Sequence, residues 1–198
     1  MKRPILVFDI ETQKLFQEIR GGRIGDLKLA CAVVKEFENN ATHVFCTMHG
    51  DGAEQARELH KLLSTASLVV GFNHERFDFR VLEGYGLSFK GFPSFDIMLD
   101  IEKRAKRKHG LDAVCRATLG KGKSGDGAMA PQLWRQGRFE ELVTYCMGDV
   151  ALTSELFLHG LTYGKVAVSS GPGPRWVHAP WRGEAHVARA LMAEEPQR

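Results

Sequence analysis

Phe8-Asp9-Ile10-Glu11-Thr12 closes the first apolar run of the chain, residues 5–10. The run is short and rich in branched and aromatic residues, which predicts a strand buried on both faces. Because side chains alternate along a strand, Asp9 and Glu11 should point to the same side near its carboxyl end, where open α/β sheets place their sites. Two carboxylates that converge beside a core need a cation or bound protons to offset their repulsion. We favour the cation.

The composition predicts one soluble domain with a tail. The chain has 198 residues, 43% of them hydrophobic and 26% charged, as in ordinary globular domains. The sequence shows no secretory leader and no apolar stretch near the roughly 20 residues of a membrane span, so we expect a cytoplasmic location. The cysteines show no CxxC spacing and should be buried thiols, neither zinc ligands nor disulfide partners. They are Cys31, Cys46, Cys115 and Cys146.

Positive charge is concentrated in residues 101–125, which hold eight basic and two acidic side chains although the net charge is only +3. A basic segment on a slightly acidic body favours a partner with a phosphate backbone. A solvated helix face followed by a loop explains the charges equally well. The basic residues are Lys103, Arg104, Lys106, Arg107, Lys108, Arg116, Lys121 and Lys123.

The order of predicted elements favours an α/β fold with a mixed sheet, since strand, helix and strand follow one another after an initial hairpin. Asn73 is placed to cap the second helix, and residues 161–198 form a Gly/Pro-rich tail. We predict strands at 27–37, 42–48 and 68–72; helices at 51–63, 74–83, 109–119 and 138–159; a mobile loop at 120–127; a linker at 169–174; and a terminal helix within 183–195. Trp176 and Trp181 should dock on the domain or on a partner chain.

Two further acids fall where helices should face the core. Asp78 lies within an apolar arc of the helix at 74–83, and Asp149 lies between Leu142 and Leu156 on the helix at 138–159. Asp78 could instead be a buried Asp that is hydrogen-bonded to backbone near the start of its helix. An isolated ionised carboxylate there would cost several kcal/mol, so each should be neutral, hydrogen-bonded or metal-bound.

Taken together, the four acids indicate phosphodiester chemistry. Carboxylates suit Mg²⁺ or Mn²⁺, and two such ions about 3.5 to 4 Å apart are the usual arrangement for in-line displacement at phosphorus. The acids are Asp9, Glu11, Asp78 and Asp149.

Three motifs in order resemble the DEDD 3'-to-5' exonucleases of ribonuclease-H-like fold, which include the proofreading domains of DNA polymerases. They are Phe8-Asp9-Ile10-Glu11-Thr12, Asn73-His74-Glu75-Arg76-Phe77-Asp78 and Tyr145-Cys146-Met147-Gly148-Asp149. The resemblance covers residues 2–158 and implies a ribonuclease-H-like mixed sheet flanked by helices, with an exonuclease domain at 1–160. Tyr145 stands four residues before Asp149, as in the tyrosine branch of the family (DEDDy), and residues four apart share a helix face.

The resemblance also implies roles for these residues. Asp9 would bridge two metal ions, Glu11 and Asp149 would complete one site, Asp78 would hold the second mostly through water, and Tyr145 would orient the attacking water. The sequence departs from the family after Thr12, where many members continue with Thr-Gly. Leu15 or Phe16 is the candidate for the wedge against the terminal nucleotide, although core packing is the favoured role for either. The predicted substrate-binding residues are Thr12, Leu15, Phe16, Asn73, Lys103, Arg104, Lys106, Arg107 and Lys108.

The function that follows is metal-dependent removal of nucleoside 5'-monophosphates from the 3' end of single-stranded nucleic acid, with DNA slightly favoured over RNA. The alternatives are a catalytically idle nucleic-acid-binding module of the same fold and a structural protein whose acids are hydrogen-bonded core residues. Candidate partner proteins are a polymerase, a helicase or another repair protein. The sequence fixes neither the oligomeric state nor the choice between DNA and RNA, which depends on contacts to the 2'-hydroxyl.

Overall fold

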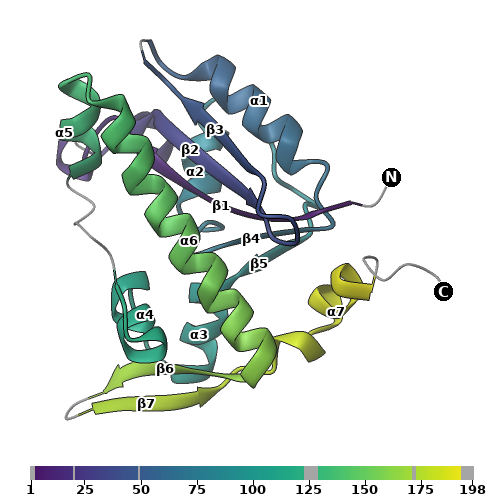
Figure 1. The fold of residues 1–198 in the computed structure, drawn as a ribbon. Coiled ribbons are helices and arrows are strands. Elements are labelled where there is room, and N and C mark those ends of the chain that lie inside the picture. The colour runs from purple at the N-terminus through teal and green to yellow at the C-terminus, as the bar shows by residue number, and fades with distance from the viewer. Residues whose placement is uncertain (1–2, 20, 49, 123–128, 171–172, 193–198) are drawn as a thin grey trace.

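A mixed five-stranded sheet with strand order β3-β2-β1-β4-β5 organises the protein (Figure 1). In this computed structural model, residues 3–19, 21–48, 50–122, 129–170 and 173–192 are described. β1 pairs antiparallel with β2 and parallel with β4, β2 pairs antiparallel with β3, and β4 pairs parallel with β5. The predicted α/β class with a mixed sheet is therefore confirmed. The strands are β1 Ile5–Thr12, β2 Leu29–Glu36, β3 Thr42–Cys46, β4 Leu68–Gly71 and β5 Ser94–Asp96.

β1 is buried on both faces, as its continuous apolar run predicts. Ile5 and Val7 belong to one core cluster with residues of α6, whereas Leu6 and Phe8 belong to a second cluster with residues of α1 and α2. Strand alternation therefore directs the odd-numbered residues of β1 to the α6 face. The helices are α1 Ala53–Leu63, α2 Asp78–Glu83, α3 Ile97–Ala105, α4 Leu111–Leu119, α5 Met129–Arg135, α6 Phe139–Tyr163 and α7 Ala185–Met192, with 3-10 turns η1 Phe16–Glu18, η2 Ile24–Leu27 and η3 Trp181–Gly183.

The long helix α6 confirms the prediction of a helix at 138–159 and continues for one more turn. It ends at Gly164, which adopts a left-handed conformation with φ of 62° and donates its N–H to the carbonyl of Gly160. That conformation is a common helix stop because glycine has no Cβ to clash. Figure 1 shows α6 crossing one face of the sheet from α5 to the C-terminal hairpin.

The C-terminal segment, residues 165–170 and 173–192, contains two strands and a helix. The linker predicted at 169–174 is therefore wrong where the structure describes it. β6 Lys165–Ser170 and β7 Gly173–His178 pair antiparallel as a hairpin. The Gly/Pro-rich stretch therefore includes residues of both strands. α7 lies within the predicted terminal helix, whose last residues fall outside the described ones.

Trp181 anchors this segment to the domain, as predicted for one of the two tryptophans. Its side chain is fully buried against Phe95 and Phe157. A Cβ on Gly160 would lie 1.9 Å from Cε3 of Trp181, so the indole occupies the space that a larger residue in α6 would fill. Trp176 is 49% exposed.

Besides the two strands of the hairpin, the elements β5, α3 and α5 were not predicted, and one boundary differs. β5 has three residues and α5 has seven, too few for a clear periodic pattern. The predicted loop at 120–127 lies mostly outside the described residues. The helix predicted at 74–83 begins only at Asp78, so the prediction that Asn73 caps it is wrong. Asn73 instead has φ of 69° and starts a turn. In the described part of the chain, no helix combines the length and apolar character of a membrane span.

Candidate active site

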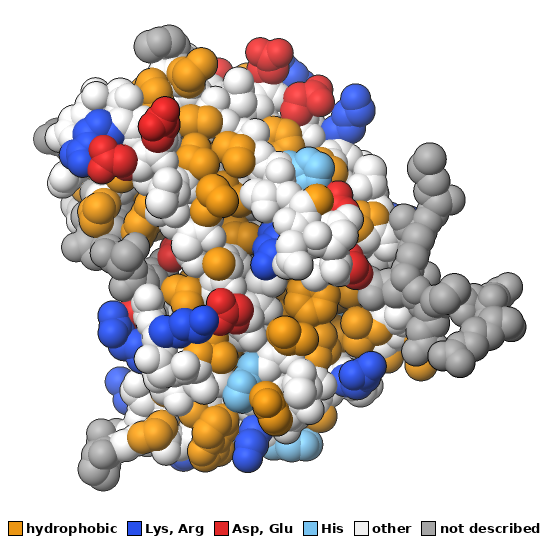
Figure 2. All heavy atoms as spheres, viewed as in Figure 1, with side chains coloured by type: hydrophobic (Ala, Val, Ile, Leu, Met, Phe, Trp, Pro, Cys, Tyr) orange, Lys and Arg blue, Asp and Glu red, His pale blue; other side chains and the backbone are white. Residues whose placement is uncertain are grey.

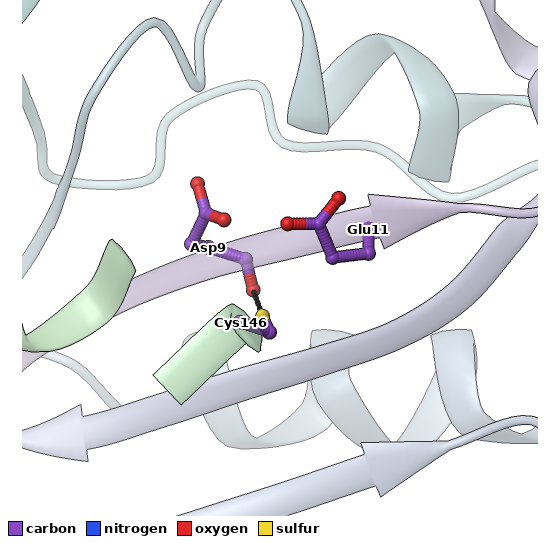
Figure 3. A group of neighbouring side chains, drawn as sticks. All are labelled: Asp9, Glu11 and Cys146. Atoms are coloured by element: carbon purple, nitrogen blue, oxygen red, sulfur yellow. Dashed lines mark hydrogen bonds between the residues drawn. The ribbon is translucent and has the colours of Figure 1, made fainter. Parts of the chain in front are cut away.

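The two acids of β1 converge as the strand periodicity predicts. A carboxylate oxygen of Asp9, a carboxylate oxygen of Glu11 and the sulfur of Cys146 all lie within 4.8 Å of one another. Figure 3 shows both carboxylates on the same side of β1, with Cys146 of α6 against the backbone of Asp9. Asp9 is partly exposed and Glu11 is 9% exposed, so the pair borders solvent at one edge of the core.

Cys146 fixes the position of α6 against β1. Its thiol donates a hydrogen bond to the backbone carbonyl of Asp9, with 3.5 Å from Sγ to O. Burial raises the pKa of this thiol well above its usual value, and Cys31, Asp9 and Glu11 raise it further. All four cysteines are free; Cys31, Cys115 and Cys146 are buried as predicted, whereas Cys46 is only partly buried. The place of Cys146 beneath the acids was not predicted, because the sequence identifies it only as a buried thiol.

Asp78 is attached to β1 through the backbone. Its Oδ1 accepts a hydrogen bond from the N–H of Ile10 at 3.2 Å, and the residue is 2% exposed. This donor is available because the ladder between β1 and β4 ends at the pair Val7 and Val70. The third predicted acid therefore lies beside the residue that separates Asp9 from Glu11.

Asp149 and Tyr145 lie on α6, on either side of Cys146 in sequence. Asp149 is 4% exposed and Tyr145 is 7% exposed, so both face the interior. The contact between Cys146 and Asp9 brings this part of α6 to the acid pair. All three motifs thus reach the same edge of the sheet.

Asp96 organises the turn before Asp78, and the sequence analysis missed it. This buried carboxylate accepts hydrogen bonds from the backbone N–H groups of Asn73, Glu75 and Leu99, at 2.9, 3.0 and 3.1 Å. It caps α3 and at the same time holds the turn that leads to α2. The signal available was an acid directly after an apolar residue and before a helix, a common capping pattern.

His74 lies under the same turn and is fully buried. Its Nε2 lies 2.8 Å from Oγ of Ser94, and its Nδ1 lies 3.6 Å from Oδ2 of Asp96. Burial lowers the pKa of His74, although Asp96 and Glu75 act in the opposite direction. We therefore take the buried imidazole as neutral at pH 7. It packs closely on Gly71, where a Cβ would lie 2.8 Å from Nδ1.

The other predicted substrate-binding residues of the first two motifs differ in exposure. The Thr12 hydroxyl donates to the carbonyl of Lys14, and Leu15 is half-buried. Phe16 is 56% exposed, which excludes core packing for it, and its ring lies 5.8 Å from the ring of Phe77. An exposed aromatic therefore lies next to the residue that precedes Asp78. Asn73 lies in the turn held by Asp96.

The predicted basic residues lie at the C-terminal end of α3 and just beyond it. The guanidinium of Arg104 pairs with Asp100 at 2.7 Å and with Glu184 at 2.6 Å, which joins α3 to the C-terminal segment. The remaining members, Lys103, Lys106, Arg107 and Lys108, are exposed.

A separate pocket of about 550 Å³ lies between η2 and α2 and includes Arg23, Arg76 and Arg80 in its lining. Arg76 pairs with Glu102, and Arg80 pairs with Glu83. The described lining of this pocket does not include the acids of β1, so we do not place the chemistry there.

The donor set fits a hard divalent cation. Carboxylate oxygens that converge within 4.8 Å are the ligands that Mg²⁺ and Mn²⁺ prefer. The thiol of Cys146 is a softer ligand. It stays protonated because it donates a hydrogen bond to the backbone carbonyl of Asp9. The ligands that this cluster offers to a cation are therefore carboxylate oxygens.

The fold and this acidic edge define the class. The model of the RNase_H superfamily matches residues 6–159, and the chain belongs to this superfamily. No curated protein sequence matches the chain significantly.

Two solved structures share the fold. The family B DNA polymerase of the hyperthermophilic archaeon Pyrobaculum calidifontis is 19% identical, with a TM-score of 0.63 over 79% of this chain and 24% of the polymerase. RNase D of Trypanosoma brucei is 16% identical, with a TM-score of 0.55 over 80% of this chain and 56% of RNase D. The chain thus spans a quarter of the first protein and just over half of the second.

Proposed function

We propose that this protein is a metal-dependent exonuclease of the DEDDy type that removes nucleoside 5'-monophosphates from the 3' end of single-stranded nucleic acid. The observation that carries the proposal is the convergence of Asp9 and Glu11 at the edge of β1, with Asp78 hydrogen-bonded to the backbone between them. Membership of the RNase H superfamily and the order of the three motifs support it.

The acids would hold two Mg²⁺ or Mn²⁺ ions, with Asp9 shared between them, Glu11 and Asp149 completing one site and Asp78 serving the other. Bound metal of this kind supplies an activated water and offsets charge that develops on the phosphoryl oxygens. The chain itself supplies the positions of the ligands. The hydrogen bond from Ile10 to Asp78 and the contact of Cys146 with Asp9 keep the three elements together.

Tyr145 is proposed to orient the attacking water. It precedes Asp149 by four residues and so lies on the same side of α6. Its low exposure limits the rotation of the phenol, which favours a fixed orientation towards that water.

The substrate proposal rests on groups around the acids. The exposed Phe16 would contact the terminal base as a wedge. Thr12, the buried last residue of β1, and Asn73, in the turn before α2, would contact the substrate beside it. The exposed residues Lys103, Lys106, Arg107 and Lys108 would contact phosphates farther along the strand. The two solved structures compared above are those of a DNA polymerase and an RNase D. We keep DNA as the slightly favoured substrate, with a polymerase, a helicase or a repair protein in the cytoplasm as the expected partner.

The test is hydrolysis of a 5'-labelled single-stranded oligonucleotide with Mg²⁺ or Mn²⁺, with matched DNA and RNA strands side by side. We expect a ladder of shortened products that chelator abolishes. Asp9→Asn should abolish it too, whereas Asp112→Asn, a change of the same kind at an acid 43% exposed on α4, should not.

Two results would contradict the proposal. A ladder that persists in Asp9→Asn would remove Asp9 from the chemistry. Tight binding of the strand without hydrolysis under any metal condition would favour the idle binding module.

A further inference from the structure

Three exposed side chains and the partly buried His159 form a cluster at the C-terminal end of α6, which we call the hairpin platform: His159, Tyr163, Lys165 and Trp176. The ring of Trp176 stacks on the ring of His159 with 6.1 Å between centroids, and Nζ of Lys165 lies 4.9 Å from the centroid of the Trp176 ring. The ring of Tyr163 lies 4.6 Å from His159. Tyr163 is 63% exposed and Trp176 is 49% exposed, which is unusual for two large aromatics that are so close together.

The sequence around the hairpin platform contains no acid. Residues 156–183 include Lys165, Arg175 and Arg182 together with two histidines, and neither Asp nor Glu. At the end of the molecule where Figure 1 places the hairpin, Figure 2 shows basic, histidine and hydrophobic side chains and no acidic ones among the described residues on that face. A surface of this composition repels other cations and attracts polyanions.

The hairpin also adjoins the basic end of α3. A guanidinium N–H of Arg175 donates to the carbonyl of Ala105, the last residue of α3, at 3.4 Å. Burial lowers the pKa of His109, and the positive charges of Arg107 and Arg175 lower it further. Two basic segments that are about 70 residues apart in the sequence are thus joined into one basic end.

This end is separate from the acids and mostly outside the superfamily match, which stops at residue 159. Tyr163 follows Asp149 by 14 residues on α6, which corresponds to about 21 Å at about 1.5 Å per residue. A strand with about 3.4 Å between stacked nucleotides would need roughly six nucleotides to cover that distance.

We propose that the hairpin platform is a second binding site for single-stranded nucleic acid, in which bases stack on Tyr163 and Trp176 while Lys165 contacts a phosphate. Aromatic side chains beside basic ones are the usual means of holding a single strand without regard to sequence. The charge and the exposed rings favour this occupant over an apolar protein surface, which would leave Lys165 desolvated.

Binding is measured with the full chain in chelator, so that no hydrolysis is needed, using a labelled 12-nucleotide poly-dT strand over a range of salt concentrations. Trp176→Ala should weaken binding roughly tenfold with little change in salt dependence, because it removes stacking and no charge. Trp176→Phe should retain most of the affinity. Lys165→Gln should lower the magnitude of the salt slope by about 0.7, the value for one phosphate contact on a single strand.

The matched controls are Met48→Ala, at a side chain 61% exposed near β3, and Lys61→Gln, at an exposed lysine of α1. Neither should change affinity or slope. Equal affinity of Trp176→Ala and the wild-type protein would overturn the proposal. So would a change in oligomeric state of Trp176→Ala with unchanged binding, since the platform would then be a protein interface.

A second measurement depends on the proposed function as well. With Mg²⁺ or Mn²⁺, Trp176→Ala should raise KM for a 12-nucleotide substrate while leaving kcat unchanged, and should leave a 4-nucleotide substrate unaffected because it is too short to reach the platform. Loss of the KM effect with binding still impaired would place the strand elsewhere during hydrolysis. Absence of hydrolysis in the wild-type protein would refute the exonuclease but not the binding site.

Discussion

Different interactions hold the acid edge of the sheet and the C-terminal segment to the domain. The acid edge is the region of Asp9, Glu11, Asp78 and Asp149, and the C-terminal segment comprises residues 165–170 and 173–192. At the acid edge, buried polar groups make the connections: Asp78 bonds to Ile10, and Asp96 bonds to the turn before it. The C-terminal segment is anchored by the indole of Trp181, which packs on Gly160 of α6 and donates a hydrogen bond from Nε1 to Oδ2 of Asp100 at 2.6 Å. The carboxylates at the first region thus accept hydrogen bonds from backbone N–H groups, whereas the second region is held by one aromatic side chain against α3 and α6. The comparison suggests that the first region is built to position carboxylates and the second for attachment.

The largest expected effect is that of Asp149→Asn. If the acid edge positions metal ligands, the rate of hydrolysis should fall about a thousandfold, because loss of a ligand removes several kcal/mol of transition-state stabilisation. Stability should not fall, since the change removes a buried negative charge. Glu155→Gln, at an exposed acid on the same helix, is the control. Equal rates for the two variants would show that the acid edge is structural.

Gly160→Ala should be the most destabilising single change at the C-terminal segment. Its Cβ would lie 1.9 Å from the Trp181 ring, so the indole must move, at a cost of about 3 kcal/mol for overpacking. Gly148→Ala is the matched control, because nothing lies within 4 Å of its Cβ on the same helix, and it should be neutral or slightly stabilising. Urea denaturation of both variants gives the comparison. Similar stabilities would mean that Trp181 can leave its site freely.

Asp96→Ala should have a smaller effect on stability and a distinct one on activity. Three backbone N–H groups lose their acceptor, which should cost roughly 2 kcal/mol. The turn before Asp78 should loosen, lowering kcat more than it raises KM. Asp51→Ala removes an exposed acceptor for the N–H of Ala53 at the start of α1 and should leave kcat unchanged. If both variants lose only stability, Asp96 does not position Asp78.

The acid edge should also be the pH-sensitive region. Burial lowers the pKa of His74 in the folded state, so the unfolded state binds the proton first, near its usual pKa of about 6.5. The stability that His74 contributes is therefore complete above that pH and falls as the pH drops towards the lower folded pKa. Urea denaturation at pH 7.5 and 5.5 should show a smaller difference for His74→Gln than for the wild-type protein. An equal difference would assign the pH dependence to other groups.

The sequence predicted the elements with long or regular patterns. β1 and α6 were recognisable because apolar residues repeat over eight residues in the first and over several turns in the second. Asp78 and Asp149 were conspicuous because each interrupts an apolar arc, and the structure buries both. Their roles as metal ligands stay a prediction.

The missed elements depend on tertiary contacts. β5 exists because Ser94, Phe95 and Asp96 pair with β4, and three residues carry too little pattern to reveal this. The hairpin of β6 and β7 was missed because its Gly- and Pro-rich sequence resembles a linker. The start of α2 was misplaced because Asp96, more than 20 residues away, competes for the backbone of the turn. No local propensity reports a partner at that distance.

β4 pairs only with the first residues of β1. This short pairing matters for redesign of the sheet and for changes of the sheet in evolution. Because β4 stops level with the first half of β1, the N–H of Ile10 is left for a side chain of another element. Extending β4 by two residues would let the ladder capture that donor and would displace Asp78 from it. The length of β4 therefore decides whether the backbone of β1 has a free donor for Asp78.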